Sequence, residues 1–241
     1  MARRFLIALG LSILSLGAPA AERAELDLIG YSPDGRYFAF EEFGIQDGSG
    51  FVYSSVYVVD LAEDDWAAGP FRRQAPDEIT TLATIRDEAL EDATEALGAL
   101  DVLHPAVLIA MNGDGETGAD GLSLDFGVPG YSDPGHVFGS YRLSLEIFKA
   151  PSPLDCIAYL GDDPMGFGLI LGSDDFDREI YRDAAIPGSR GCPTTYRIHA
   201  VAVPYQSYDL AHAVALISVY AFGFEGVDRR FVAVPLTLPG P

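Results

Sequence analysis

The chain has 241 residues, with 36 acidic and 15 basic side chains, and its formal net charge at pH 7 is −21. A surface this negative repels phosphate backbones and anionic lipid headgroups, so the charge disfavours a nucleic-acid-binding protein. After the first twenty residues, no apolar run approaches the roughly 20 residues that span a bilayer. We therefore expect no membrane span in the remainder of the chain.

The first twenty residues have the pattern of a secretory signal peptide. Arg3 and Arg4 precede an apolar run over residues 5–17, and small residues stand at Ala18 and Ala20, where a signal peptidase reads. This run is shorter than the roughly 20 residues of a membrane anchor. We expect residues 1–20 to be removed and residues 21–241 to form a single mainly β domain that is periplasmic or secreted.

The chain has two cysteines, Cys156 and Cys192. In an exported protein an isolated pair favours one disulfide, whereas redox pairs and metal sites usually show closer cysteine spacing. Closing a loop of this length would restrict the unfolded chain by about 3 to 4 kcal/mol. We therefore predict a Cys156–Cys192 disulfide.

The clearest β signal lies in residues 26–61. Residues 26–30 lead into a turn at Pro33-Asp34-Gly35, in which proline presets φ and glycine accepts a positive φ. Residues 36–43 and 54–61 are rich in aromatic and β-branched residues, which favour strands. These segments predict three antiparallel strands, with a glycine-rich loop over residues 44–50. We expect residues 62–74 to be an irregular connection.

A change of period marks one helix. From Asp77 to Leu100 apolar residues recur about every 3.6 positions, which is typical of an amphipathic helix. Pro76 and Asp77 suit its start and Gly98 suits its end. We expect this helix to lie across a sheet, with its acidic side in solvent.

The remaining segments predict mostly short strands. They are residues 107–111, 122–126, 141–148, 156–160, 166–171, 196–203, 213–222 and 230–236. Residues 172–190 show no clear period. The predicted fold is mainly β, with twisted antiparallel sheets in a sandwich or degenerate propeller-like arrangement and one long amphipathic helix.

Two resemblances accompany these patterns. Residues 26–61 resemble one blade of the TolB-like (WD40-like) β-propeller repeats. Over nearly the whole chain, several runs resemble a bacterial family of predicted secreted proteins classed as domain of unknown function 2259; they are residues 35–42, 46–51, 190–193, 196–199, 223–226 and 228–231. The second resemblance implies export and one shared architecture, and it supplies no activity or ligand.

One polar cluster stands at the end of the second predicted strand and in the loop after it. Its members are Glu41, Glu42, Gln46 and Asp47. Strand alternation places Glu42 on the side of Phe40 and Glu41 on the opposite side. Oxygen ligands on a flexible loop suit calcium or a polar ligand, and we expect no other cofactor. In the alternative, Glu42 pairs with an arginine such as Arg36 and the loop is merely exposed.

The sequence lacks the usual catalytic signatures: the nucleophile elbow, the zinc-protease motif, the phosphate-binding loop and Cys-x-x-Cys. We predict no catalytic or metal-binding residues and a non-enzymatic binding or scaffolding module of the cell envelope, with an envelope or protein partner. The alternative is a hydrolase that acts on an envelope polymer through a carboxylate pair such as Glu41 and Glu42. An enzyme should show a pocket with convergent ionisable groups of displaced pKa, and a binding module an exposed apolar or aromatic patch.

Overall fold

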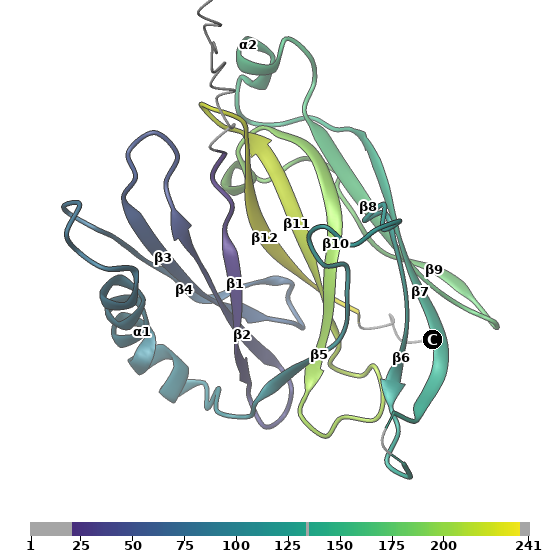
Figure 1. Ribbon diagram of the computed structural model, residues 1–241. Helices are drawn as coiled ribbons and strands as arrows, with labels where there is room; N and C mark the ends of the chain where they lie inside the picture. The colour runs from purple at the N-terminus through teal and green to yellow at the C-terminus, as the bar shows by residue number, and fades with distance from the viewer. Residues whose placement is uncertain (1–20, 134, 237–241) are drawn as a thin grey trace, which may run out of the picture.

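The computed structural model describes residues 21–133 and 135–236 and contains three four-stranded antiparallel sheets (Figure 1). The expected signal peptide, residues 1–20, lies outside the described residues. The sheets are stacked face to face in layers, and helix α1 covers the outer side of the first sheet. The predicted mainly β fold with one longer helix is confirmed.

The first layer, named here the N-terminal sheet, contains the strands of the predicted hairpins. Its strands are β1 (Glu25–Tyr31), β2 (Tyr37–Ile45), β3 (Val52–Asp60) and β4 (Asp65–Gln74), in that spatial order. Gly35 has a φ of 69° in the turn between β1 and β2, as the Pro-Asp-Gly pattern predicted. One face of this sheet packs on α1 and the other on the middle layer.

The middle layer is the central sheet, and it is covered on both faces. Its spatial order is β12 (Val227–Pro235), β11 (Val214–Phe222), β10 (Pro193–Pro204) and β5 (Ala106–Met111). Along β11, Val214 and Leu216 pack toward the N-terminal sheet, while Ala215 and Ile217 pack toward the third sheet. A strand buried on both faces needs apolar residues at every position, which explains the continuous apolar run in this part of the sequence.

The third layer is the outer sheet. It contains β6 (Ser123–Pro129), β7 (Val137–Lys149), β8 (Met165–Ser173) and β9 (Asp177–Arg182), again in sequential order. Leu143, Leu169 and Phe167 are fully buried against the central sheet. Strand β9 was not predicted, because as a largely exposed edge strand it carries no alternating apolar pattern.

Helix α1 (Leu82–Ala99) packs on β3 and β4 through small side chains. Ala89 and Ala93 are fully buried against Val56. The predicted start at Asp77 is wrong by five residues. The Asp77 carboxylate accepts from the backbone N–H groups of residues 79 and 80 in a preceding turn, and Thr81 caps the helix instead.

Two further expectations are wrong. Residues 62–74 are mostly strand β4 rather than irregular. The strand is a largely exposed edge and shows no apolar alternation, and an edge strand tolerates a proline such as Pro70. The Gly69–Pro70 peptide bond is cis. Residues 156–160 form the short helix α2 (Cys156–Leu160), which ends at Gly161 with a φ of 70°. An apolar run of five residues does not distinguish a strand from a helix.

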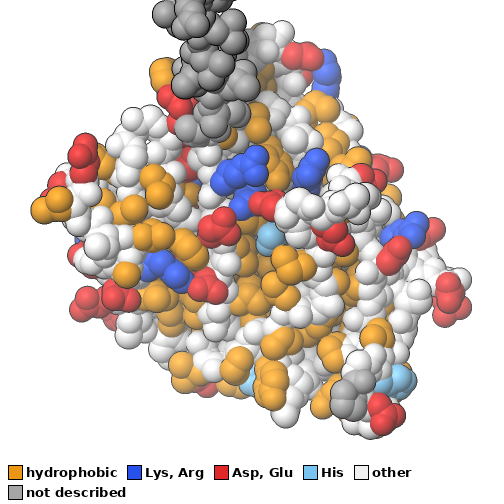
Figure 2. Space-filling model, viewed as in Figure 1, with side chains coloured by type: hydrophobic (Ala, Val, Ile, Leu, Met, Phe, Trp, Pro, Cys, Tyr) orange, Lys and Arg blue, Asp and Glu red, His pale blue; other side chains and the backbone are white. Residues whose placement is uncertain are grey.

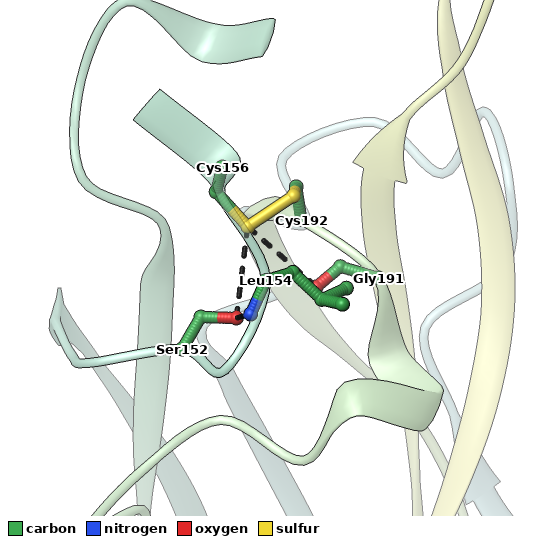
Figure 3. The surroundings of a disulfide bond; sticks show 5 residues. All are labelled: Ser152, Leu154, Cys156, Gly191 and Cys192. Carbon is green, nitrogen blue, oxygen red and sulfur yellow. Dashed lines mark hydrogen bonds between the residues drawn. A yellow bond between two sulfur atoms is a disulfide. The ribbon is translucent and has the colours of Figure 1, made fainter. Parts of the chain in front are cut away.

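The predicted disulfide is present and ties α2 to the start of β10 (Figure 3). The Cα atoms of Cys156 and Cys192 are 5.4 Å apart. The sulfur of Cys156 lies 3.6 Å from the Ser152 hydroxyl oxygen, so the bridge is packed into its loop. Across the described residues, no helix combines the length and apolar character needed to cross a bilayer.

Candidate functional site

A cleft of about 800 Å³ opens along strand β12, the edge of the central sheet. One wall is the inner face of β2, β3 and β4. The opposite wall is formed by the end of β9 and the 3-10 helix η1 (Gly188–Arg190). Residues 230–234 of β12 lie between the two walls. The cleft therefore brings together segments from all three sheets.

Aromatic rings line the wall provided by the N-terminal sheet. The ring centroids of Phe40 and Tyr57 are 5.0 Å apart, and those of Tyr57 and Trp66 are 6.0 Å apart. Phe40 is buried, Tyr57 is half-buried and Trp66 is 44% exposed. This series of rings runs from the core to the surface and offers flat apolar area to a ligand.

A buried charged cluster lies at the inner end of the cleft. Glu42 is 1% exposed; its Oε2 accepts from the Phe231 backbone N–H at 2.8 Å, and its Oε1 lies 3.4 Å from Nε of Arg230. Arg230 also pairs with Glu22 and donates to the Tyr53 hydroxyl at 2.6 Å. Burial raises the pKa of Glu42 to about 7, although the positive charge of Arg230 opposes this shift.

The opposite wall is held by a second buried ion pair. Nη1 of Arg190 donates to both carboxylate oxygens of Asp183 at 2.9 Å, and its Nη2 donates to the Tyr181 hydroxyl at 2.7 Å. Arg190 stands two residues before Cys192, so the disulfide anchors the chain next to this wall.

Arg72 on β4 is the cleft arginine without a carboxylate partner. Arg73, Arg190 and Arg230 each pair with an acid, whereas Arg72 has none within 4.0 Å among the described residues. Its guanidinium lies near Tyr57, where its positive charge lowers the pKa that burial raises, and its side chain is exposed. An exposed guanidinium beside aromatic rings can bind a carboxylate or another anion.

The structure separates the four residues of the predicted polar cluster. Glu41 faces helix α1, and Arg86 of this helix donates to its carboxylate at 2.7 Å. Ser54 of the neighbouring strand β3 donates to the same carboxylate at 2.8 Å. Glu42 and Gln46 line the cleft, whereas Asp47 accepts from the Glu225 backbone N–H at 2.8 Å.

The alternation predicted for β2 is therefore seen in the structure, and Glu41 and Glu42 do not form a pair. The partner of Glu42 is Arg230, because Arg36 pairs with Asp60 at 2.6 Å. Within residues 21–133 and 135–236, no three His, Cys, Asp or Glu side chains gather as a metal site requires. The predicted residues are divided between the α1 side of the sheet, the cleft and the β11–β12 connection, and calcium binding at this loop stays a prediction.

Sequence reasoning missed most of the cleft. Trp66 and Arg72 lie in the segment that was expected to be irregular, and Tyr181 lies in a strand without a pattern. Trp66 is the only tryptophan in the chain and was the one available signal. The cleft depends on strands that are distant in sequence, so no local pattern indicates it.

Comparisons with known proteins give one match. A family model described as predicted secreted protein (DUF2259) matches residues 39–237. No curated protein and no solved structure matches the chain significantly. The family description agrees with the expected periplasmic or secreted location. The match does not support the resemblance of residues 26–61 to a TolB-like blade.

Proposed function

We propose that this chain, which belongs to the family of predicted secreted proteins (DUF2259), is a non-enzymatic binding protein of the cell envelope. In this proposal residues 21–241 are the exported domain and the cleft along β12 is its ligand site. The observation that carries the proposal is the combination of aromatic rings and the unpaired Arg72 in one cleft of about 800 Å³. Ligand sites typically measure about 300 to 1,000 Å³ and combine apolar area with a few polar groups.

The hydrolase alternative has two observations in its favour: Glu42 and Asp64 both line the cleft, and burial raises the pKa of each carboxyl group. Two others weigh against it. Glu41 lies on the opposite face of the sheet from Glu42, so the predicted carboxylate pair of Glu41 and Glu42 does not form in the cleft. Both oxygens of Glu42 are already engaged, one by the Phe231 N–H and one by Arg230. A carboxylate held in this way is suited to structure more than to proton transfer.

The anionic aromatic dye anilinonaphthalene sulfonate tests the proposal, because it offers rings to the aromatic wall and a sulfonate to Arg72. Trp66 is the only tryptophan and lines the cleft, so energy transfer from tryptophan to the dye reports binding, and the effect of Arg72→Met assigns that binding to the cleft. We expect saturable transfer in the folded protein. Arg72→Met should weaken binding about fivefold or more, the effect of losing one charge-assisted contact.

Arg142→Met is the matched control. Arg142 forms an exposed ion pair with Asp125 on the outer sheet, away from the cleft residues, and its replacement should leave dye binding unchanged. Absence of saturable transfer, or equal affinity in the wild-type protein and Arg72→Met, would contradict a ligand site in this cleft.

A further inference from the structure

Strand β12 is an edge of the central sheet, and in the part of the chain that the structure describes its outward backbone groups have no partner at one position, Ala233. In an antiparallel strand the N–H and C=O groups of every second residue point to the same side. The Arg229 N–H donates outward to Glu22 O at 2.7 Å, and the Phe231 N–H donates outward to Glu42. The next outward residue is Ala233, and no hydrogen bond to its N–H or C=O on this side occurs within the described residues.

The residues around Ala233 are those of an exposed edge. Val232, Ala233 and Pro235 are half-buried, and residues 232–234 line the cleft. Pro235 occupies the following outward position, where its missing N–H removes no bond to β11. An edge strand with unpaired backbone groups is a template for pairing with another strand.

The walls on either side are placed to receive side chains of an added strand. Successive side chains of a strand point to opposite faces. On the face of Phe231 and Ala233 they would meet Tyr57, Trp66 and Arg72. On the face of Val232 and Val234 they would meet the wall formed by Tyr181, residues 187–189 and Arg190.

Building on the proposed function, we propose that the ligand is an extended peptide segment that adds a fifth strand to the central sheet along β12. Main-chain hydrogen bonds to Ala233 give affinity, and the two walls select alternate side chains, as in other β-augmentation complexes. The unpaired Arg72 selects an acidic side chain on the aromatic face. The charge of Arg72 favours an acidic side chain at the position that faces it, among aromatic ones, whereas Asp64 and Asp65, which also line the cleft, disfavour acidic side chains beside them.

A second copy of this chain fits the edge less well. The free edge of β12 is recessed between the N-terminal sheet and η1, so the edges of two copies would be kept apart by these walls. The cleft volume of about 800 Å³ is that of a ligand site. A single extended segment needs a width of only about 4.8 Å per strand.

The probe is a capped heptapeptide, acetyl-Tyr-Val-Asp-Val-Tyr-Val-Asp-amide, titrated into the folded protein while Trp66 fluorescence is recorded. We expect saturable binding, together with slower hydrogen exchange of the Ala233 amide in NMR spectra. Ala233→Pro removes this donor at an outward position like that of Pro235. The variant should bind the peptide about fivefold more weakly or worse, which is the effect of one hydrogen bond.

Two modified peptides separate backbone pairing from side-chain contact. A peptide with N-methyl groups on alternate residues should bind about fivefold more weakly or worse, because it cannot pair along one side. A peptide with Asn in place of Asp should bind more weakly to the wild-type protein and equally to Arg72→Met.

Dye binding separates failure of this inference from failure of the proposed function. The wild-type protein should bind anilinonaphthalene sulfonate whether or not it binds the peptide, and the far-UV circular dichroism spectrum of Ala233→Pro should match that of the wild-type protein if the variant is folded. If the dye binds and the peptide does not, or if the N-methyl peptide binds equally well, strand addition is wrong and a cleft ligand site stands. If neither dye nor peptide binds, both proposals fail. A dimer that dissociates on Ala233→Pro would assign the edge to a second copy instead.

Discussion

At the scale of single residues, Glu42 is a buried carboxyl group with a strongly raised pKa. Its carboxylate is buried, accepts a backbone hydrogen bond and faces Arg230. Burial raises its pKa from 4.5 to about 7 in the folded protein. Below pH 4.5 the Glu42 carboxyl group is protonated in both the folded and the unfolded protein, and the stability that its raised pKa contributes is fully present. As pH rises through 7 this carboxyl group also ionises in the folded protein, and that stability is lost.

Glu42→Gln should remove this pH dependence. Glutamine keeps an acceptor for the Phe231 N–H and does not titrate. From pH 5 to pH 8, the free energy of unfolding of the wild-type protein should fall relative to that of the variant by about 2 to 3 kcal/mol. Denaturant unfolding at the two pH values measures this difference. Parallel curves for both proteins would contradict the raised pKa.

Arg230 neutralises Glu42 and Glu22, which are both buried. Arg230→Met should cost about 3 to 5 kcal/mol of unfolding free energy at pH 8, because it leaves buried carboxylates without a cation. Arg142→Met, which breaks an exposed pair with Asp125, should cost less than about 1 kcal/mol. Urea denaturation of the two variants provides the comparison, and equal losses would rule out a special role for the buried cluster.

At the scale of elements, the boundary of α1 is set by its cap more than by its apolar stripe. The hydroxyl of Thr81 accepts from the Thr84 N–H at 3.2 Å, whereas Ile79, which precedes the helix, is 87% exposed. A side chain that satisfies a free N–H in the first turn stabilises the helix start. The apolar residue at position 79 therefore has no part in the packing of α1.

Thr81→Ala should lower the unfolding free energy by about 1 kcal/mol through loss of this cap. Thr94→Ala is the matched control, because Thr94 lies inside the same helix and its hydroxyl donates to Leu90 O. Alanine has a higher helix propensity than threonine, so this change should be neutral or slightly stabilising. Thermal unfolding of both variants distinguishes them, and a larger loss for Thr94→Ala would place the cap elsewhere.

At the scale of the whole molecule, the disulfide connects distant parts of the architecture. Cys156 lies in α2 after the long strand β7, and Cys192 lies between η1 and β10, so the bond supports the cleft wall that contains Arg190. On the face shown in Figure 2, acidic side chains are scattered over the surface. With a net charge of −21, repulsion between acidic side chains destabilises the folded protein as a whole. The Cys156–Cys192 disulfide offsets part of this destabilisation.

Replacing both cysteines by serine should lower the unfolding free energy by about 3 to 4 kcal/mol, the entropy of closing a loop between residues 36 apart. Dye affinity measured below the unfolding transition should also fall, because the wall at Arg190 loses its anchor. The wild-type protein treated with a reducing agent should behave like the double variant. An unchanged denaturation midpoint would show that packing alone holds this loop.

The sequence by itself determined the features that depend on neighbouring residues. The turn at Pro33-Asp34-Gly35, the strands around it and the amphipathic stripe of α1 follow from backbone preferences and side-chain periodicity. The disulfide followed because the chain offers one pair of cysteines. The opposite facing of Glu41 and Glu42 followed from the two-residue period of a strand.

Only the tertiary structure decided which strands are edges, which strand lies in the middle and where the cleft opens. Trp66 and Arg72 gain a role because β4 extends beside β12, and these strands are about 160 residues apart in sequence. Edge strands such as β4 and β9 need no apolar alternation, so local periodicity does not report them. A binding cleft is a property of packing between distant segments, and its physical cause is the way the three sheets cover one another.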